Sequence, residues 1–184
     1  MYSAIFLDRD GVIIQNRADY IRSWKEVEFL PNSLRALSLL SQTPYKIIIT
    51  TNQSAVGRGI ITMEQAEAIN QRIIKKITEA GGRVDGLFMC PHTPDDRCNC
   101  RKPLPGLILQ AAHALSIDLP SSVMIGDALT DIQAGSAAGI KKLILVKTGR
   151  GQDQARLLQT SPSPQILVVD DLLSAVNIIL NKSD

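Results

Sequence analysis

Six short apolar segments recur along this chain of 184 residues, with segments of helical periodicity between them. The apolar segments show little alternation with polar residues, which indicates strands that are buried on both faces. Strands of this kind belong to parallel sheets covered by helices. The sequence therefore predicts strands at residues 3–7, 45–50, 86–89, 123–125, 142–146 and 166–169. It predicts helices at residues 33–41, 63–80, 106–115, 130–138 and 172–180, and a surface loop with at most a short helix at residues 149–165.

Length and composition favour one ordinary globular domain, which we expect to extend over residues 1–184. The net charge of +2 gives no electrostatic basis for binding nucleic acid or an acidic membrane. No apolar run approaches the roughly 20 residues of a membrane helix, and the N-terminus lacks the pattern of a secretory signal. The three cysteines are clustered and odd in number, which argues against a disulfide framework and favours the cytoplasm.

Polar residues follow four of the predicted strands. Since the carboxyl ends of parallel strands form the ligand-binding edge of such a sheet, we expect these residues to meet there. Each one alone would more simply be a turn, a helix cap or a solvated charge. Together they offer the oxygen ligands that suit Mg²⁺, a carboxylate nucleophile and a lysine, which is the chemistry of phosphoryl transfer. The segments are DRDG (residues 8–11), TTNQS (50–54), CRKP (100–103) and GDALTD (126–131).

The order FLDRDGV, TTNQS, CRKP and GDALTD resembles the haloacid dehalogenase-like (HAD-like) phosphatases, and more narrowly the branch that acts on heptose bisphosphates and histidinol phosphate. The resemblance extends from Ile5 to Val146. It implies an α/β fold, a single Rossmann-like three-layer domain with a mainly parallel sheet. No large insertion follows Asp10 or separates Thr51 from Lys102, so we expect no large cap domain and a site open to small phosphomonoesters.

The resemblance also implies catalytic roles. Asp8 would be the nucleophile, and Asp10 would be the acid that protonates the leaving oxygen and then the base that activates water. Spacing of two residues can place both carboxylates on one side of an extended segment. Thr51 would donate hydrogen bonds to the transferred phosphoryl group, while Lys102 would neutralise charge between that group and Asp8.

Two metal sites follow. The resemblance implies that Mg²⁺ is bound by Asp8, Asp127 and the backbone carbonyl of Asp10. Asp131 would support these ligands without binding the ion itself. A second set of ligand types matches a structural Cys₃His zinc site, and the family branch carries a similar loop. Free thiols are the alternative, and a redox role is disfavoured because no C-x-x-C occurs. Such a zinc ion would hold an irregular loop so that Arg101 and Lys102 reach the active site; its ligands would be Cys90, His92, Cys98 and Cys100.

The substrate is less constrained. The segment TTNQSAVGRGIIT resembles the heptose enzymes, whereas the short zinc loop is closer to the histidinol phosphatases, and Ala128 replaces a lysine usual in the heptose enzymes. We expect removal of the 7-phosphate of D-glycero-D-manno-heptose 1,7-bisphosphate, with histidinol phosphate or another small sugar phosphate as the alternative. Candidate substrate-binding residues are Asn16, Asp19, Asn52, Gln53, Ser54 and Arg101.

Two other classes of protein share part of this pattern. A phospho-accepting regulator would also carry carboxylates, a threonine and a lysine at strand ends, but Asp10 would speed hydrolysis of the phosphorylated state. A zinc-containing binding protein without catalysis is disfavoured because every expected catalytic position is filled. We therefore expect an enzyme whose partner is a small phosphorylated molecule, without nucleic acid or membrane, as a monomer or weak oligomer.

Overall fold

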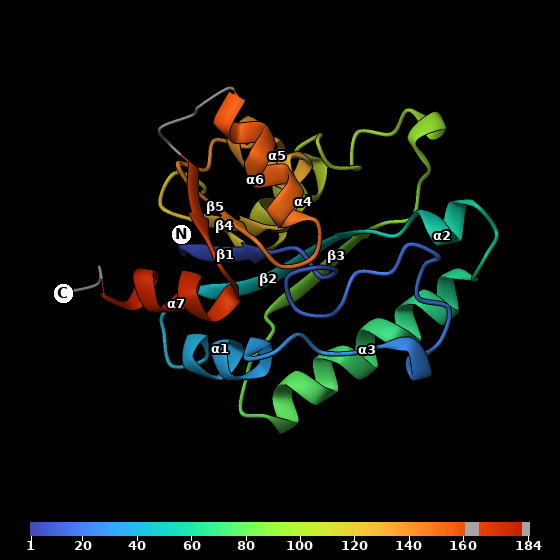
Figure 1. Cartoon of the computed structure of the whole chain (residues 1–184), viewed down its shortest axis with the longest axis horizontal. Coiled ribbons are helices and arrows are strands. Elements are labelled where there is room, and N and C mark those ends of the chain that lie inside the picture. Colours follow the sequence, from blue (N-terminus) through green and yellow to red (C-terminus); the bar gives the residue numbers. More distant parts are fainter. Residues whose placement is uncertain (161–165, 182–184) are drawn as a thin grey trace.

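The computed structural model describes residues 1–160 and 166–181, which form a parallel sheet with helices on both faces (Figure 1). All neighbouring strands pair in parallel, in the order β3-β2-β1-β4-β5-β6. The predicted three-layer α/β fold is therefore confirmed, and β1 and β4 lie at the centre of the sheet. The strands are β1 (Ala4–Leu7), β2 (Lys46–Asn52), β3 (Gly86–Cys90), β4 (Val123–Gly126), β5 (Lys142–Val146) and β6 (Ile166–Val169).

The helices divide between the two faces of the sheet. Alternate residues of β1 explain the division, because Ile5 and Leu7 pack in one core cluster while Ala4 and Phe6 pack in the other. Helices α1 (Ser33–Leu40), α3 (Met63–Glu79) and α7 (Leu172–Asn181) cover the first face. Helices α4 (Gly106–Leu115), α5 (Leu129–Ala137) and α6 (Gly151–Thr160) cover the second. Short helices also occur at α2 (Ser54–Gly57), η1 (Trp24–Glu26) and η2 (Pro94–Asp96).

The segment at residues 149–165, predicted as a surface loop with at most a short helix, contains the ten-residue helix α6. The glycine, serine and proline residues of this stretch suggested a loop, but Ala155 and Leu158 stand three residues apart and so share one helix face. Both pack against the second core cluster, and this tertiary contact stabilises a helix that local pattern alone did not predict. The SPSP part of the predicted loop, residues 161–164, lies outside the described residues.

Helix α3 begins where its capping signal predicts. The backbone N–H of Gln65 donates to the hydroxyl of Thr62 (3.2 Å), and the N–H of Thr62 donates to the side chain of Gln65 (2.8 Å). This capping box satisfies two N–H groups that a helix start leaves free. Residues Ile69, Ile73 and Ile77 then face the core, so both the start and the rotation of α3 are fixed.

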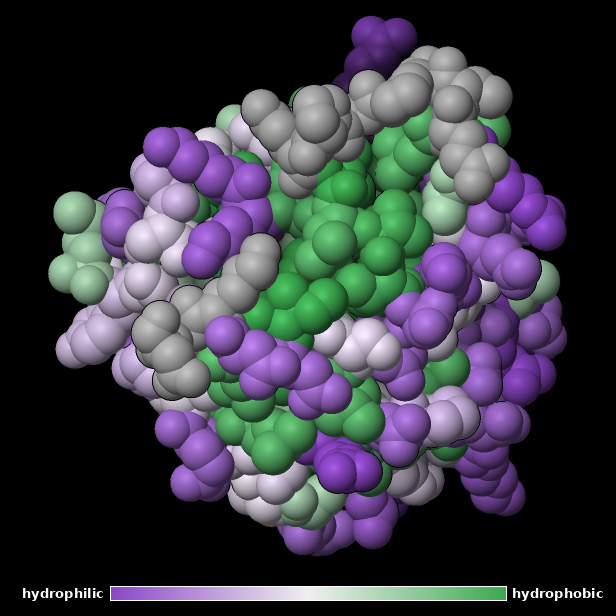
Figure 2. All heavy atoms as spheres, turned by 60° about the vertical axis from the view of Figure 1, so that its left-hand side comes forward, coloured by the Kyte–Doolittle hydropathy of each residue, from purple (hydrophilic) through white to green (hydrophobic). Residues whose placement is uncertain are grey.

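Hydrophobic side chains gather on the side of the molecule that carries both chain ends (Figures 1 and 2). Leu167 of the edge strand β6 is 40% exposed. The amino-terminal end of β1 lies on this side, so the polar segments that follow the strands emerge on the other side. Among the described residues, no helix combines the length and apolar character needed to cross a membrane.

Candidate active site

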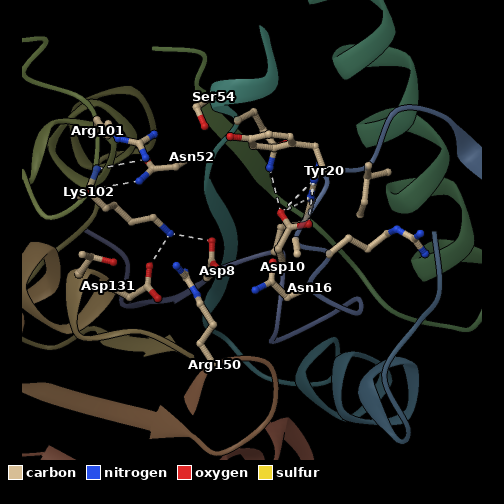
Figure 3. Close-up of a pocket in the computed structure, with 16 residues that line it drawn as sticks. Asp8, Asp10, Asn16, Tyr20, Asn52, Ser54, Arg101, Lys102, Asp131 and Arg150 are labelled. Atoms are coloured by element: carbon tan, nitrogen blue, oxygen red, sulfur yellow. Dashed lines mark hydrogen bonds and ion pairs between the residues drawn. The ribbon is translucent and has the colours of Figure 1, made fainter. Parts of the chain in front are cut away.

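Four strand ends converge on one cavity of about 360 Å³ (Figure 3). The structure thus brings together residues that are far apart in the chain, because parallel pairing aligns the carboxyl ends of β1, β2, β3 and β4 along one edge. The cavity wall includes Asp8, Asp10, Asn16, Asn52, Gln53, Ser54, Arg101, Lys102 and Asp131, all of them predicted, and also Arg17, Tyr20, Thr130 and Arg150.

Lys102 is held at the base of the cavity by three acceptors. Its ammonium lies 2.7 Å from a carboxylate oxygen of Asp8 and 2.6 Å from one of Asp131. It also donates to the backbone carbonyl of Thr50 (2.8 Å). All three N–H groups of the ammonium are therefore used, and the side chain is only 2% exposed. The lysine is a fixed positive charge beside Asp8.

The backbone of Lys102 is fixed as well. The side chain of Asn52 donates to the carbonyl of Lys102 and accepts from its N–H, both at 3.1 Å. This reciprocal pair joins the end of β2 to the loop after β3. Asn52 was predicted to bind substrate, and although it lines the cavity, the structure uses its amide to hold Lys102. The Lys102–Pro103 peptide is cis.

One carboxylate oxygen of Asp127 accepts no hydrogen bond from the described residues and lies 3.6 Å from the guanidinium of Arg150. This is the buried Oδ1, whereas the Oδ2 of Asp127 accepts from the backbone N–H of Arg150 (2.8 Å). A Cβ added at Gly11 or at Gly149 would collide with this carboxylate, and both glycines have positive φ angles of 86° and 59°. Only glycine fits at these two positions, and the close approach of their backbone fixes Asp127.

The arrangement of carboxylates fits a divalent cation. Oxygens of Asp8, Asp127 and Asp131 lie within 4.8 Å of one another. Both oxygens of Asp131 are already occupied, since one pairs with Lys102 and the other accepts from the N–H of Ala128 (3.1 Å). The Oδ1 of Asp127, which accepts no hydrogen bond in the described part of the chain, and the carboxylate of Asp8 are the donors that Mg²⁺ prefers, in the small number that it usually takes from protein.

The titration of these groups reflects an excess of buried negative charge. Burial raises the pKa of Asp8 to about 8, against the opposing charge of Lys102 and with added repulsion from Asp131 and Asp127. Burial and the charge of Asp131 likewise raise the pKa of Asp127. Burial alone would lower the pKa of Lys102, but Asp131 and Asp8 raise it above its ordinary value. Lys102 is thus an ammonium, and a cation between Asp8 and Asp127 would relieve their repulsion.

Asp10 faces the cavity and is surrounded by donors. The guanidinium of Arg9 donates to both of its oxygens (3.0 and 3.1 Å), and the side chain of Gln53 donates to Oδ2 (2.9 Å). The hydroxyl of Thr51 lies 3.5 Å from the same oxygen. With a side chain 20% exposed, Asp10 can reach a bound substrate and water. This is the position that acid–base chemistry beside Asp8 needs.

The loop after β1 departs from prediction at Asp19. Asp19 lies outside the cavity lining; its side chain is 61% exposed and pairs with Arg17 and Arg22, each at 3.6 Å. Tyr20 has a φ of 66°, which turns the chain so that Tyr20 lines the cavity instead. A positive φ at tyrosine has no local sequence signal.

Arg150 was not predicted as a site residue. It follows the fifth strand, so the argument from strand ends could have found it.

The predicted zinc ligands form a compact cluster. The sulfur of Cys100 lies 3.1 Å from that of Cys90 and 3.5 Å from that of Cys98, and the Nδ1 of His92 lies 3.3 Å from the sulfur of Cys100. Tetrahedral zinc with Zn–S distances of about 2.3 Å separates its sulfur ligands by roughly 3.8 Å, so this donor set fits zinc. The guanidinium of Arg101 donates to the carbonyl of His92 (3.1 Å), which links the cluster to the cavity.

Comparison with known proteins agrees with this fold and site. The family model described as HAD-hydrolase-like matches residues 99–175. The D-glycero-beta-D-manno-heptose-1,7-bisphosphate 7-phosphatase of Bordetella bronchiseptica is 41% identical over 148 residues, which are 80% of this chain and 82% of the relative. The protein of that name from Pseudomonas aeruginosa is 36% identical over 178 residues, 97% of this chain and 98% of the relative.

A solved structure is similar over nearly the whole chain. It is the crystal structure of D,D-heptose 1,7-bisphosphate phosphatase from B. bronchiseptica complexed with magnesium and phosphate, with a TM-score of 0.92 and 37% identity. The match covers 98% of this chain and 99% of that one. Fold and site thus define a HAD-like phosphatase, a phosphoric monoester hydrolase. Within that class, the chain belongs to the D-glycero-beta-D-manno-heptose-1,7-bisphosphate 7-phosphatase family, as the resemblance of its motifs predicted.

Proposed function

We propose that this chain is a single-domain, Mg²⁺-dependent phosphatase that removes the 7-phosphate of a D-glycero-D-manno-heptose 1,7-bisphosphate through an aspartyl-phosphate. The observation that carries the proposal is the placement of Asp8 beside two groups: the ammonium of Lys102, at 2.7 Å, and the carboxylate of Asp127, whose Oδ1 accepts no hydrogen bond from the residues that the structure describes. A carboxylate so placed has a positive charge on one side and a metal ligand on the other. Both are requirements of nucleophilic attack on a phosphate dianion.

In the first step, a carboxylate oxygen of Asp8 attacks phosphorus. A bond forms between this oxygen and phosphorus, the bond from phosphorus to the sugar oxygen breaks, and Asp10 gives its proton to that sugar oxygen. Thr51 donates to the oxygens of the transferred group, and Lys102 balances their charge against that of Asp8. Asp8, Asp127 and the backbone carbonyl of Asp10 would hold a Mg²⁺ ion, which would supply electrostatic stabilisation of the developing charge.

In the second step, Asp10 is a carboxylate and takes a proton from water. The oxygen of that water attacks phosphorus, the acyl-phosphate bond to Asp8 breaks, and inorganic phosphate leaves. Asp8 returns to its carboxylate form and Asp10 returns to its protonated form. The same residue can serve both steps because the leaving oxygen and the attacking water approach phosphorus from one side, opposite Asp8.

The charge of the cavity supports a substrate with a second anionic group. Beyond Lys102, four arginines line it: Arg9, which pairs with Asp10, and Arg17, Arg101 and Arg150. A bisphosphate would place one phosphate at Asp8 and the other among these cations, whereas histidinol phosphate carries a positive amine that they would repel. Asn16, Gln53 and Ser54 line the same cavity and are proposed to bind the sugar hydroxyls. Histidinol phosphate stays the second candidate because the zinc loop is short and Ala128 replaces the usual lysine.

The zinc cluster has a structural role in this proposal. Four protein ligands would close the coordination of zinc and leave no position for substrate. The ion would stiffen the loop that carries Arg101 and Lys102. It needs reduced thiols, which fits our expectation of a cytoplasmic enzyme. We expect a monomer or weak oligomer.

Steady-state kinetics test this function. The wild type with Mg²⁺ should hydrolyse heptose 1,7-bisphosphate at C7 with a kcat/KM above that for histidinol phosphate. Asp8→Asn should abolish both turnover and the phosphoenzyme, and Asp10→Asn should lower turnover roughly 10²–10⁴-fold. Normal turnover by a folded Asp8→Asn protein would exclude Asp8 as the nucleophile. A tenfold preference for histidinol phosphate would establish the second candidate instead.

A further inference from the structure

We propose that Arg9 and Asn70 are positioning residues for Asp10. Asn70 on α3 holds the guanidinium of Arg9, and Arg9 in turn holds the carboxylate of Asp10 in the orientation for proton transfer. The inference rests on the proposed function, because it needs Asp10 to act as acid and base. It adds α3, which covers one face of the sheet, to the elements on which catalysis depends.

Arg9 is a buried cation with an unusual place in the fold. It stands between the two aspartates of the DRDG motif, yet its side chain is only 2% exposed. Its Nε and Nη2 donate to the two oxygens of Asp10 at 3.0 and 3.1 Å, the fork geometry in which arginine binds a carboxylate. In the described part of the chain, Asp10 is the one carboxylate within ion-pair distance of Arg9. The fork fixes Asp10 only if the guanidinium itself is fixed.

Asn70 supplies that fixed point. Its side-chain carbonyl accepts from the Nη1 of Arg9 at 2.7 Å, and its own NH₂ lies 3.5 Å from the sulfur of Met89. Asn70 is 3% exposed and lies between Ile69 and Ile73, which bury the inner face of α3. A buried amide without a partner costs roughly 1–3 kcal/mol, so its orientation is strongly determined. The bond between Asn70 and Arg9 spans 61 positions of the chain.

The consequence for catalysis is geometric. Asp10 has to meet the sugar oxygen in one step and water in the next, and both need hydrogen-bond distance to its carboxylate. Displacement of a reacting group by about 1 Å can cost roughly 10²-fold in rate. Without Asn70, the guanidinium of Arg9 loses its third contact and can turn with the carboxylate that it holds. Loss of Asn70 should thus weaken proton transfer while Asp8 and Lys102 stay in place.

Two leaving groups separate this role from a merely structural one. A sugar leaves from phosphorus as a strong base that needs a proton from Asp10, whereas p-nitrophenolate leaves without one. The parameter kcat/KM reports the steps up to formation of the phosphoenzyme, so it isolates the acid role. Asn70→Leu should lower kcat/KM about tenfold or more for heptose 1,7-bisphosphate and less than threefold for p-nitrophenyl phosphate. Its KM for the sugar substrate should stay near the wild-type value.

Two companion variants complete the experiment. Asn70→Asp keeps an oxygen acceptor for Arg9 and should restore most of the selective loss. Gln71→Leu makes the same kind of change at the next, exposed position of α3 and should behave as wild type. An equal loss on both substrates, or no loss in folded Asn70→Leu, would overturn the proposal. If the wild type does not use the heptose substrate, the proposed function fails separately, and any alkyl phosphate that it does hydrolyse tests Asn70.

Discussion

The ammonium of Lys102 lies 2.6 Å from the carboxylate of Asp131, and both side chains are 2% exposed. Asp131 is therefore the group that holds the lysine from the side away from Asp8. Its second oxygen accepts from the N–H of Ala128 at the start of α5, so the carboxylate is also anchored to the helix. One aspartate thus connects the loop after β4 with the lysine delivered by the loop after β3.

We predict that Asp131→Asn lowers kcat/KM by about 10- to 100-fold, because an amide can neither neutralise Lys102 nor satisfy both contacts at once. Mg²⁺ affinity should change much less, since Asp127 keeps its Oδ1 available to the ion. Kinetics and Mg²⁺ titration of the folded variant measure the two effects. The exposed Asp153→Asn is the matched control. Wild-type kcat/KM in Asp131→Asn would show that Lys102 needs no support from α5.

Binding of Mg²⁺ should release protons near neutral pH. The pKa of Asp8 is raised to about 8 by burial, so the folded protein without metal holds a proton there that a bound cation displaces. The apparent affinity for Mg²⁺ should then rise as pH increases from about 6 to about 8 and level off above. Calorimetric titrations in two buffers of different ionisation heat count the protons. Equal heats in both buffers would contradict the prediction.

The same shift has a consequence for stability without Mg²⁺. A carboxyl whose pKa is raised on folding binds its proton more tightly in the folded state than in the unfolded state. Its contribution therefore lowers stability as pH rises from about 4, the ordinary pKa of aspartate, to about 8. Asp8→Asn should remove this slope. Thermal melts of both proteins across that pH range, without Mg²⁺, measure the difference.

The two histidines provide a matched test of the zinc site. Purified protein should contain about one zinc per chain, and His92→Ala should lose it whereas His113→Ala, on the exposed face of α4, should keep it. The sheet should still fold, since Cys90 is the last residue of β3 and the other three cluster residues lie in the loop after it. Activity of His92→Ala should fall because Arg101 and Lys102 lose their support. Metal analysis, circular dichroism and kinetics check each point; a zinc-free variant with wild-type kcat/KM would refute the structural role.

Arg150 should contribute to substrate binding through its side chain alone. Its backbone N–H donates to Oδ2 of Asp127 and its guanidinium lies 3.6 Å from Oδ1. Arg150→Ala should keep the backbone contact, so Asp127 should stay in place and Oδ1 should stay available to a metal ion. We predict an increase in KM for heptose 1,7-bisphosphate of about tenfold, partly restored in Arg150→Lys, because a cation lost from the cavity weakens binding of a phosphate. Lys147→Ala removes a charge from the same loop, where the lysine pairs with Asp170 at 2.8 Å, and is the control. Equal KM values in Arg150→Ala and wild type would exclude a role of the Arg150 side chain in substrate binding.

The sequence by itself determined the parallel sheet and the contents of its carboxyl edge. Buried strands leave apolar runs that are visible locally, and parallel pairing then aligns their ends, so Asp8, Lys102 and Asp127 could be brought together without coordinates. The cluster of three cysteines and His92 was predictable for the same local reason, since all four residues stand within eleven positions. What a short segment or a strand end encodes can be found from the chain alone.

Only the tertiary structure decided which side chains touch. The pairing of Arg9 with Asn70 depends on the rotation and position of α3 against the sheet, and the use of Asn52 to hold Lys102 depends on how the loop after β3 folds back. Tyr20 lines the cavity in place of Asp19 because one residue adopts a positive φ, and α6 forms because the core offers its apolar face a surface to cover. These contacts join segments far apart in the chain, and their free energies depend on packing that no local pattern records.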